Sequence, residues 1–186
     1  MSIIEQVKNY VESECRKPGS HYGYEPFPYH LVPMVSYSLL LADKLGADKE
    51  VVEIATWLHD IGAIVHGRDN HHITGAEIAR EKLTEFGYPK AKTELVCKCI
   101  LNHRGSVDND RESLEEKIVA EADVLSNFDN ISGIFKAAFV YEGLSQGEAQ
   151  KSAFDKLTRK YNKLHFEESK EIIRPKYEAV KLLFGS

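Results

Sequence analysis

The sequence contains a His59-Asp60 pair at the end of an apolar stretch, and further histidines and one aspartate lie far from it along the chain. The candidate residues are His30, His59, Asp60, His71, His72, His103 and Asp123. Imidazole nitrogens and carboxylate oxygens are the ligands that hard or borderline divalent metal ions accept in proteins. Because these residues are widely separated, only folding can gather them, and we expect a metal centre built from several helices.

Asp123 carries a signal of its own because it follows Ala122 and lies two positions before Leu125, both of which are typical of a buried helix face. Burying a carboxylate there is unfavourable unless it is paired with a cation or bound to a metal ion. A salt bridge to a nearby lysine or arginine is therefore the alternative to metal binding at this position.

The composition is that of an ordinary globular domain, with 186 residues, 42% hydrophobic and 28% charged. Such a chain can bury one core, so we expect a single domain covering residues 1–186. The formal net charge of −5 argues against a nucleic-acid partner, because binding to a phosphate backbone needs a clustered Lys/Arg surface. A small anionic substrate is still compatible with this charge, since a bound cation reverses the local field.

The cysteines and the N-terminal sequence indicate the cellular setting. Cys15, Cys97 and Cys99 provide neither a disulfide framework nor the paired motifs of a zinc ribbon. The first ten residues carry charged side chains where a signal peptide needs an apolar segment, and no stretch has the length of a membrane span. We therefore expect a cytoplasmic protein without a membrane partner.

The elements that must position the candidate residues are helices, because apolar residues recur at helical spacing and no stretch alternates as a β-strand does. We predict an all-α fold of about seven to nine helices. The expected helices cover residues 3–15, 29–45, 49–60, 71–86, 89–103, 113–125, 131–140, 145–161 and 167–184. Residues 21–29 are expected to form a fixed loop because of their prolines, and Pro175 is expected to break or kink the last helix.

Local signals mark several helix ends. Asp48 predicts an N-cap, and Ser113 with Glu116 forms the pattern of a capping box. Gly46 and Gly62 predict helix ends, since glycine readily adopts the left-handed conformation found there. The His-Asp pair would then lie on the last turn of the third helix, just before Gly62, and Asp123 would lie in the middle of its helix.

Four segments in the same order resemble the HD-domain superfamily of metal-dependent phosphohydrolases. They read ATWLHDIGAIVH, HHITGAEIAR, ILNHRG and AEADVLSNFD, and with His30 the resemblance covers residues 29–127. It implies an HD-type helical bundle whose metal-binding core is residues 29–127. Helices within residues 131–184 would pack on this core, and we expect them to cover it, close the pocket or form a homodimer contact.

The resemblance also implies a ligand set. His30, His59, Asp60 and Asp123 would hold a first divalent ion, and His71 and His103 would hold a second ion bridged by Asp60. His71 is assigned because it stands four residues before Gly75, where the ligand of the family stands. His72 is the alternative to it, either as a ligand, as a group that hydrogen-bonds substrate or as an exposed helix residue.

The resemblance and this ligand set together predict hydrolysis of a phosphate ester or anhydride, with a nucleotide or another small phosphorylated molecule as substrate. One or two Mn, Fe, Co, Ni or Mg ions would activate a water molecule and stabilise the charge of the transition state. Asp60 and Arg104 are the expected catalytic residues, Arg104 because it follows His103 and can bind phosphate. Arg68 is a second candidate, and Ala63 stands where many family members have lysine.

Two other functions are compatible with the same residues. Di-iron oxygenases use the same ligand order, and they attack C–H bonds with O₂. A sensor or binding module could use the metal only to support its fold, although the complete set of ligands favours an enzyme. Aromatic residues just before His30 would wall the pocket or pack in the core; they are Tyr22, Tyr24, Phe27 and Tyr29, with Glu25 among them.

Overall fold

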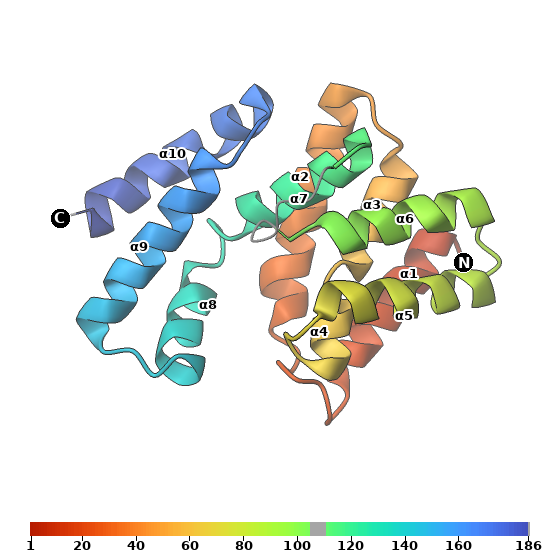
Figure 1. Ribbon diagram of the computed structural model, residues 1–186, viewed down its shortest axis with the longest axis horizontal. Coiled ribbons are helices and arrows are strands. Elements are labelled where there is room, and N and C mark those ends of the chain that lie inside the picture. Colours follow the sequence, from red (N-terminus) through yellow and green to blue (C-terminus); the bar gives the residue numbers. More distant parts are fainter. Residues whose placement is uncertain (105–110, 186) are drawn as a thin grey trace.

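The computed structural model describes residues 1–104 and 111–185, and within these ranges the chain is helical and contains no β-strand. The elements are α1 (Ile3–Arg16), η1 (Phe27–Leu31), α2 (Val32–Leu45), α3 (Lys49–Leu58), α4 (Ile61–His66), α5 (His71–Glu85), α6 (Lys90–Asn102), α7 (Leu114–Ser126), α8 (Ile131–Lys136), η2 (Ala137–Tyr141), α9 (Gln146–Asn162) and α10 (Glu167–Phe184). Figure 1 shows their arrangement. The predicted all-α fold is confirmed.

The predicted caps form in the structure. The Asp48 side chain accepts hydrogen bonds from the main-chain N–H groups of Glu50 and Val51 at the start of α3. Ser113 and Glu116 form the reciprocal capping box of α7. Gly46 ends α2 with a φ of 79°, which is favourable only for glycine. These boundaries depend on local chemistry, which is why the sequence predicted them.

Gly62 does not end a helix, and the prediction at this position was wrong. A turn at His59 and Asp60 separates α3 from α4, and Gly62 lies in the first turn of α4. A Cβ at this position would lie 2.2 Å from the carbonyl oxygen of His71 and 2.6 Å from the main-chain nitrogen of Gly75. Gly62 is therefore needed for the close approach of α4 and α5, a contact that is not local in sequence.

Two segments that contain proline also differ from the prediction. Phe27–Leu31 forms a π-helical turn that leads directly into α2, whereas a loop was expected up to Tyr29. Pro175 lies inside α10, which continues to Phe184 without a break. Tertiary contacts hold both segments in helical geometry, since Phe27 and Leu31 are buried and Ile173 and Tyr177 bury the face of α10 around Pro175.

The core is formed by α1 to α7. Helix α5 packs between α4 and α6, and α2 packs against α3 and α7. Large side chains that are fully buried in it include Leu41, Ile54, Leu58, Ile100, Ile118 and Leu125. The C-terminal ends of α3 and α6, the start of α5 and the last third of α7 meet at one side of this core, and this meeting point carries the candidate metal-binding residues.

Helices α8, α9 and α10 form a separate layer beside the core in Figure 1. Helix α10 contacts α7 and α2, and α9 packs against α8 and α10. One polar link joins this layer to α2: Asp129 accepts hydrogen bonds from Tyr37 on α2 and from Lys176 on α10. The layer therefore faces the exposed side of the meeting point of α3, α5, α6 and α7.

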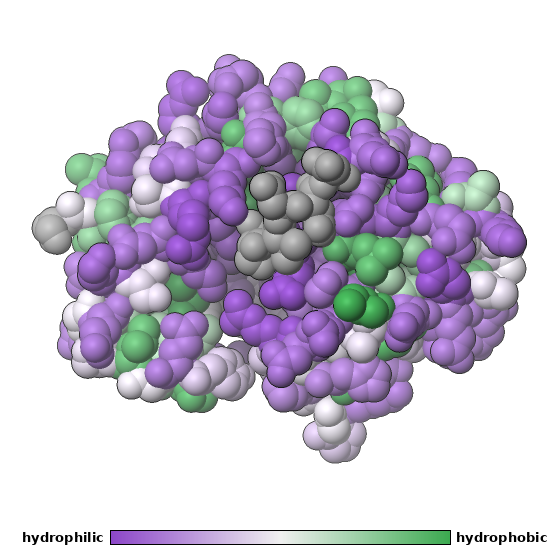
Figure 2. Space-filling model, viewed as in Figure 1, coloured by the Kyte–Doolittle hydropathy of each residue, from purple (hydrophilic) through white to green (hydrophobic). Residues whose placement is uncertain are grey.

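The surface gives two further observations. Hydrophilic side chains cover most of the face seen in Figure 2, and apolar groups appear there only in small separate patches. Among the helices of the described residues, none combines the length and the apolar content needed to cross a bilayer.

Candidate metal centre

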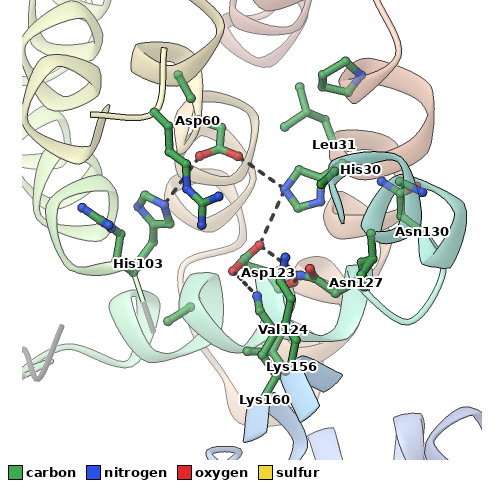
Figure 3. Close-up of a pocket in the computed structure, with 18 of the residues that line it drawn as sticks. His30, Leu31, Asp60, His103, Asp123, Val124, Asn127, Asn130, Lys156 and Lys160 are labelled. Carbon is green, nitrogen blue, oxygen red and sulfur yellow. Dashed lines mark hydrogen bonds and ion pairs between the residues drawn. The ribbon is translucent and has the colours of Figure 1, made fainter. Parts of the chain in front are cut away.

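The structure brings six of the seven candidate residues to one place, as Figure 3 shows in part. They come from five positions on the core: the η1 turn, the turn between α3 and α4, the first residue of α5, the residue after α6 and the last third of α7. In this order they are His30, His59 with Asp60, His71, His103 and Asp123. Elements far apart in sequence thus converge as the sequence predicted.

The first cluster consists of His30, His59, Asp60 and Asp123. His30 Nε2 lies 3.2 Å from His59 Nε2 and 3.6 Å from both Asp60 Oδ2 and Asp123 Oδ1. His59 Nε2 lies 3.2 Å from Asp60 Oδ2. His59 is fully buried, and the side chains of the two aspartates are 18 to 29% exposed on the pocket side. Ligand atoms of His30, His59 and Asp60 therefore lie within 4.8 Å of one another, and Asp123 adjoins this group through His30.

The second cluster shares Asp60 with the first. His71 Nε2 lies 3.4 Å from Asp60 Oδ1 and 3.3 Å from His103 Nε2. His103 Nε2 lies 3.7 Å from the same Asp60 oxygen. One oxygen of Asp60 thus faces the first cluster and the other faces the second, which is the arrangement of a carboxylate that bridges two cations.

Hydrogen bonds on the far side of each ring fix its orientation and its tautomer. The Nδ1 atoms of His59, His71 and His103 donate to the main-chain carbonyl oxygens of Thr56, Arg68 and Ile100, at 2.9, 2.8 and 2.6 Å. Ser126 donates its hydroxyl hydrogen to the carbonyl oxygen of Asp123, so its oxygen accepts from His30 Nδ1 at 3.0 Å. Each neutral ring therefore presents an Nε2 lone pair to the centre.

These lone pairs make the site suitable for cations. The Nε2 atoms of His30 and His59 lie 3.2 Å apart, and those of His71 and His103 lie 3.3 Å apart. When the rings are neutral, the lone pairs of these nitrogens face each other. Carboxylate oxygens add further acceptors, and no donor of the neutral ligand set points inward. Such a concentration of acceptors is unfavourable without a positive charge, so the donor set fits one or two divalent ions.

The pKa values of the ligands reflect this crowding. Burial opposes the charged form of His59, but the adjacent Asp60 carboxylate outweighs it and raises the pKa of His59 to about 9. Burial and the neighbouring His59 lower the pKa of His103 to about 4. The same imidazoles hold the pKa of Asp60 well below its usual value, although burial acts in the opposite direction. In the absence of a metal ion, the proton on His59 thus supplies part of the positive charge that these acceptors require.

Asp123 forms the salt bridge that was the alternative to metal binding at this position, and its other carboxylate oxygen faces the candidate ligand His30. Its Oδ1 lies 3.6 Å from His30 Nε2, while its Oδ2 forms an ion pair with Lys160 Nζ at 3.2 Å. Burial would raise the pKa of Asp123, but Lys160 and His30 lower it below its usual value. Lys160 comes from α9, and sequence reasoning missed it because nothing in the local sequence shows that this helix faces the core.

The centre opens into a pocket of about 1630 Å³ between the core and the C-terminal layer. Arg104 and Arg68, both expected from the sequence, line this pocket, as does Ala63. Further lysines and arginines come from α9 and its C-terminal end; they are Lys156, Arg159, Lys160 and Lys163. The pocket is therefore much richer in positive charge than the overall net charge of −5 suggests.

His72 lies outside both clusters. Its Nδ1 accepts a hydrogen bond from Arg104 Nη1 at 3.4 Å. Burial and the cationic Arg104 lower the pKa of His72, which keeps the ring neutral and able to accept this bond. His71 rather than His72 therefore has the position of a ligand, and His72 is placed to orient Arg104.

The aromatic segment before His30 divides between the two alternatives considered for it. Residues that line the pocket are Tyr22, Glu25 and Tyr29. Phe27 instead stacks between Tyr24 and Trp57, with ring centroids 5.7 and 5.4 Å apart. Tyr22, Glu25 and Tyr29 thus form part of the pocket wall, whereas Tyr24 and Phe27 pack against or within the core.

Comparisons with known proteins agree with this geometry. A family model described as HD domain matches residues 29–127. Bacillus subtilis YpgQ in complex with ADP is 21% identical, with a TM-score of 0.71 over 94% of this chain and 90% of that chain. An HD-superfamily hydrolase from Bacillus thuringiensis is 16% identical, with a TM-score of 0.73 over 98% and 93%. These likenesses establish the fold.

Curated relatives match only in part. A tRNA (cytidine(56)-2'-O)-methyltransferase of Picrophilus torridus is 26% identical over 134 residues, which are 64% of this chain and 37% of that protein. An uncharacterized protein of Clostridium beijerinckii is 31% identical over 75 residues, 39% of this chain and 48% of that protein. The chain thus spans less than half the length of these relatives, and their activities are not transferred to it.

Proposed function

The chain belongs to the HD domain family, and from this membership and the geometry of its metal centre we propose that it is a metal-dependent phosphohydrolase. Its substrate would be a nucleotide or another small phosphate ester or anhydride. The observation that carries this proposal is the position of Asp60, whose two oxygens face two separate histidine clusters. A carboxylate in this position suits a pair of cations that act on one phosphoryl group.

The charge of the pocket supports an anionic substrate. Arg68, Arg104 and Lys160 surround the centre from three different elements, and a phosphate at the centre would lie within their combined field. Guanidinium groups bind phosphate oxygens with strong, charge-assisted hydrogen bonds. An uncharged C–H substrate attacked with O₂ would gain nothing from this set of cations, so the pocket favours the hydrolase over an oxygenase of neutral substrates.

The residues of the chain would act as follows. Divalent ions, when bound, supply a Lewis acid that lowers the pKa of a water molecule and neutralises phosphate charge. Asp60 and the four histidines would hold the divalent ions at a fixed position. The second ring nitrogen of each histidine is anchored to a main-chain carbonyl or to Ser126, which fixes the orientation of the ring. Arg104, oriented by His72, stabilises the negative charge that develops on the phosphoryl oxygens.

A substrate screen under anaerobic conditions tests this function. The purified full chain is loaded with Mn²⁺ and incubated with nucleoside mono-, di- and triphosphates and with generic phosphate esters. We expect release of phosphate or pyrophosphate without O₂, and nucleoside phosphates come first because YpgQ was crystallised with ADP. Oxygen consumption by the iron-loaded protein, with no hydrolysis in the screen, would instead identify an oxygenase.

The matched variants are Asp60→Ala and Asp43→Ala. Asp43 is an exposed aspartate near the end of α2 and lies outside the pocket, so its loss should leave activity unchanged. Loss of Asp60 removes a ligand from both clusters, and we expect metal affinity and hydrolysis to fall by more than about 100-fold, beyond the 10- to 100-fold loss typical of outer-shell groups. Hydrolysis by Asp60→Ala at the wild-type rate would show that the assignment is wrong.

A further inference from the structure

One face of α9 lines the pocket with basic side chains. Lys156, Lys160 and Lys163, the last just beyond the helix, are spaced four and three residues apart, and Arg159 follows Lys156 by three, which places them on the same side. Ala149, Ala153 and Leu157 are buried on the adjoining part of the same side, since Lys156 follows Ala153 and Lys160 follows Leu157 by three residues. Burial of these apolar residues fixes the rotation of α9, so Lys156 and Lys160 beside them point into the pocket.

Lys156 and Lys160 differ in their partners. Lys160 is paired with Asp123 Oδ2 at 3.2 Å, and its side chain is 24% exposed. Lys156, one helical turn earlier, is half-buried and makes no hydrogen bond or ion pair with any other residue of the described ranges. Both side chains extend from α9 towards Asp123 in Figure 3. Lys156 is thus a cation inside the pocket without a counter-ion in contact.

The neighbours of Lys156 make its position unfavourable for a lysine alone. Burial, then Lys160 and Arg68, lower the pKa of Lys156, and the attraction of Glu142 and Asp123 only partly compensates. Arg68 comes from the loop between α4 and α5, and it lines both this pocket and a smaller adjoining one together with Lys156. Three cations from two walls therefore face the same space, and a bound anion would relieve their repulsion.

We propose that Lys156, with Lys160 and Arg68, binds a second phosphate group of the substrate, next to the phosphate that reacts at the metal centre. This inference rests on the proposed function and makes it more specific. Lys156 lies four residues, about 6 Å along the axis, from the lysine that touches Asp123. A substrate with two or more linked phosphates can reach both positions, whereas a phosphate monoester occupies only the first. Lys156 is therefore a specificity-determining residue that favours phosphoanhydrides.

Binding of inorganic pyrophosphate and orthophosphate to the metal-free full chain tests this subsite directly. The variants are Lys156→Met, which keeps the length of the side chain without its charge, and Lys156→Arg, which keeps the charge. Lys181→Met on α10 is the control for loss of a lysine charge elsewhere, because Lys181 is exposed, is paired with Glu178 and does not line the pocket. Isothermal titration calorimetry at constant ionic strength gives the dissociation constants.

We expect Lys156→Met to weaken pyrophosphate binding by about 10- to 100-fold, the range for a hydrogen bond to a charged group. Orthophosphate binding should change less than about threefold, and Lys156→Arg and Lys181→Met should bind pyrophosphate as wild type does. The melting temperature of Lys156→Met should be equal to or above that of wild type, because an unpaired cation leaves a half-buried site. Pyrophosphate binding by Lys156→Met at the wild-type affinity would overturn the proposal.

Steady-state kinetics with Mn²⁺ separate this inference from the proposed function. The ratio of kcat/KM for a nucleoside triphosphate to that for p-nitrophenyl phosphate should fall at least tenfold in Lys156→Met. An unchanged ratio in an active enzyme refutes the subsite alone. If the wild type hydrolyses neither compound nor any other phosphate, the proposed function is wrong, and the pyrophosphate titration still decides whether Lys156 forms an anion site.

Discussion

The proton on His59 provides a quantitative test of the metal centre. In the metal-free protein this buried ring has its Nε2 3.2 Å from Asp60 Oδ2, and its pKa is raised to about 9. An ordinary histidine has a pKa of about 6.5, so the difference of about 2.5 units corresponds to up to about 3 kcal/mol of folding free energy. Because the folded state binds this proton more tightly, the stabilisation is complete below about pH 6.5 and is lost as the pH rises through about 9.

Metal binding must displace the same proton. Between pH 7 and pH 8.5 the affinity for Mn²⁺ should therefore rise about tenfold per pH unit, or roughly 30-fold in total, with about one proton released per chain. Calorimetric titrations in two buffers of different ionisation enthalpy measure the affinity and the number of protons. Denaturation by guanidinium chloride with a chelator present, from pH 6.5 to pH 9, measures the loss of stability of the metal-free chain.

The Asp60→Asn variant is the control for this reasoning. It removes the negative charge that raises the pKa of His59 and leaves the burial that lowers it. The free energy of unfolding of this variant should no longer fall between pH 6.5 and pH 9 as that of the wild type does. A metal affinity of the wild type that is independent of pH in this range, without proton release, would refute the assignment of His59 as a protonated ligand.

Three further predictions concern single side chains. Gly62→Ala should destabilise the protein by about 3 kcal/mol in chemical denaturation, because the added Cβ would clash with main-chain atoms of α5. Gly147→Ala is the control: a Cβ there would have no neighbour within 4 Å, so this variant should be neutral or stabilising. His72→Leu should retain the wild-type metal content but lose several-fold in kcat/KM, since Arg104 loses its acceptor; loss of metal in elemental analysis would instead make His72 a ligand. Ser113→Ala should lower the free energy of unfolding by about 1 kcal/mol through loss of the α7 cap, and an unchanged value would contradict the capping role.

Much of the fold could be predicted because helix ends depend on residues close in sequence. Asp48 and the capping box at Ser113 form their hydrogen bonds within one turn of the chain, so the sequence locates them without knowledge of the core. Helix α4 was not predicted because Gly62 was taken as a helix end. Its role depends on α5, which approaches closely enough that only glycine fits.

The candidate metal-binding residues could be named from the sequence for a different reason. Histidine and aspartate are chemically distinctive, and their order along the chain matches that of one family. The sequence did not resolve His71 from His72, since both stand at the start of the same helix. The structure separates them because His71 Nδ1 is anchored to a main-chain carbonyl and its Nε2 faces Asp60, while His72 faces Arg104.

The lysines of α9 show what sequence reasoning lacked. Lys156 and Lys160 stand at helical spacing from Ala153 and Leu157, so the sequence places them beside the apolar face of an amphipathic helix. A basic face in this position is usually exposed to solvent, so nothing local distinguished it from the surface of any other helix. Only the packing of α9 against α8 and α10 turns this face towards Asp123.

By itself, the sequence determined the helical class, most helix boundaries and the residue types available for chemistry, because these follow from local propensity, capping and side-chain identity. The tertiary structure decided which oxygen of Asp60 faces which histidine pair, which ring nitrogen carries a proton and which lysines enter the pocket. These are properties of distance and direction between elements, and they exist only once packing has fixed the helices relative to one another.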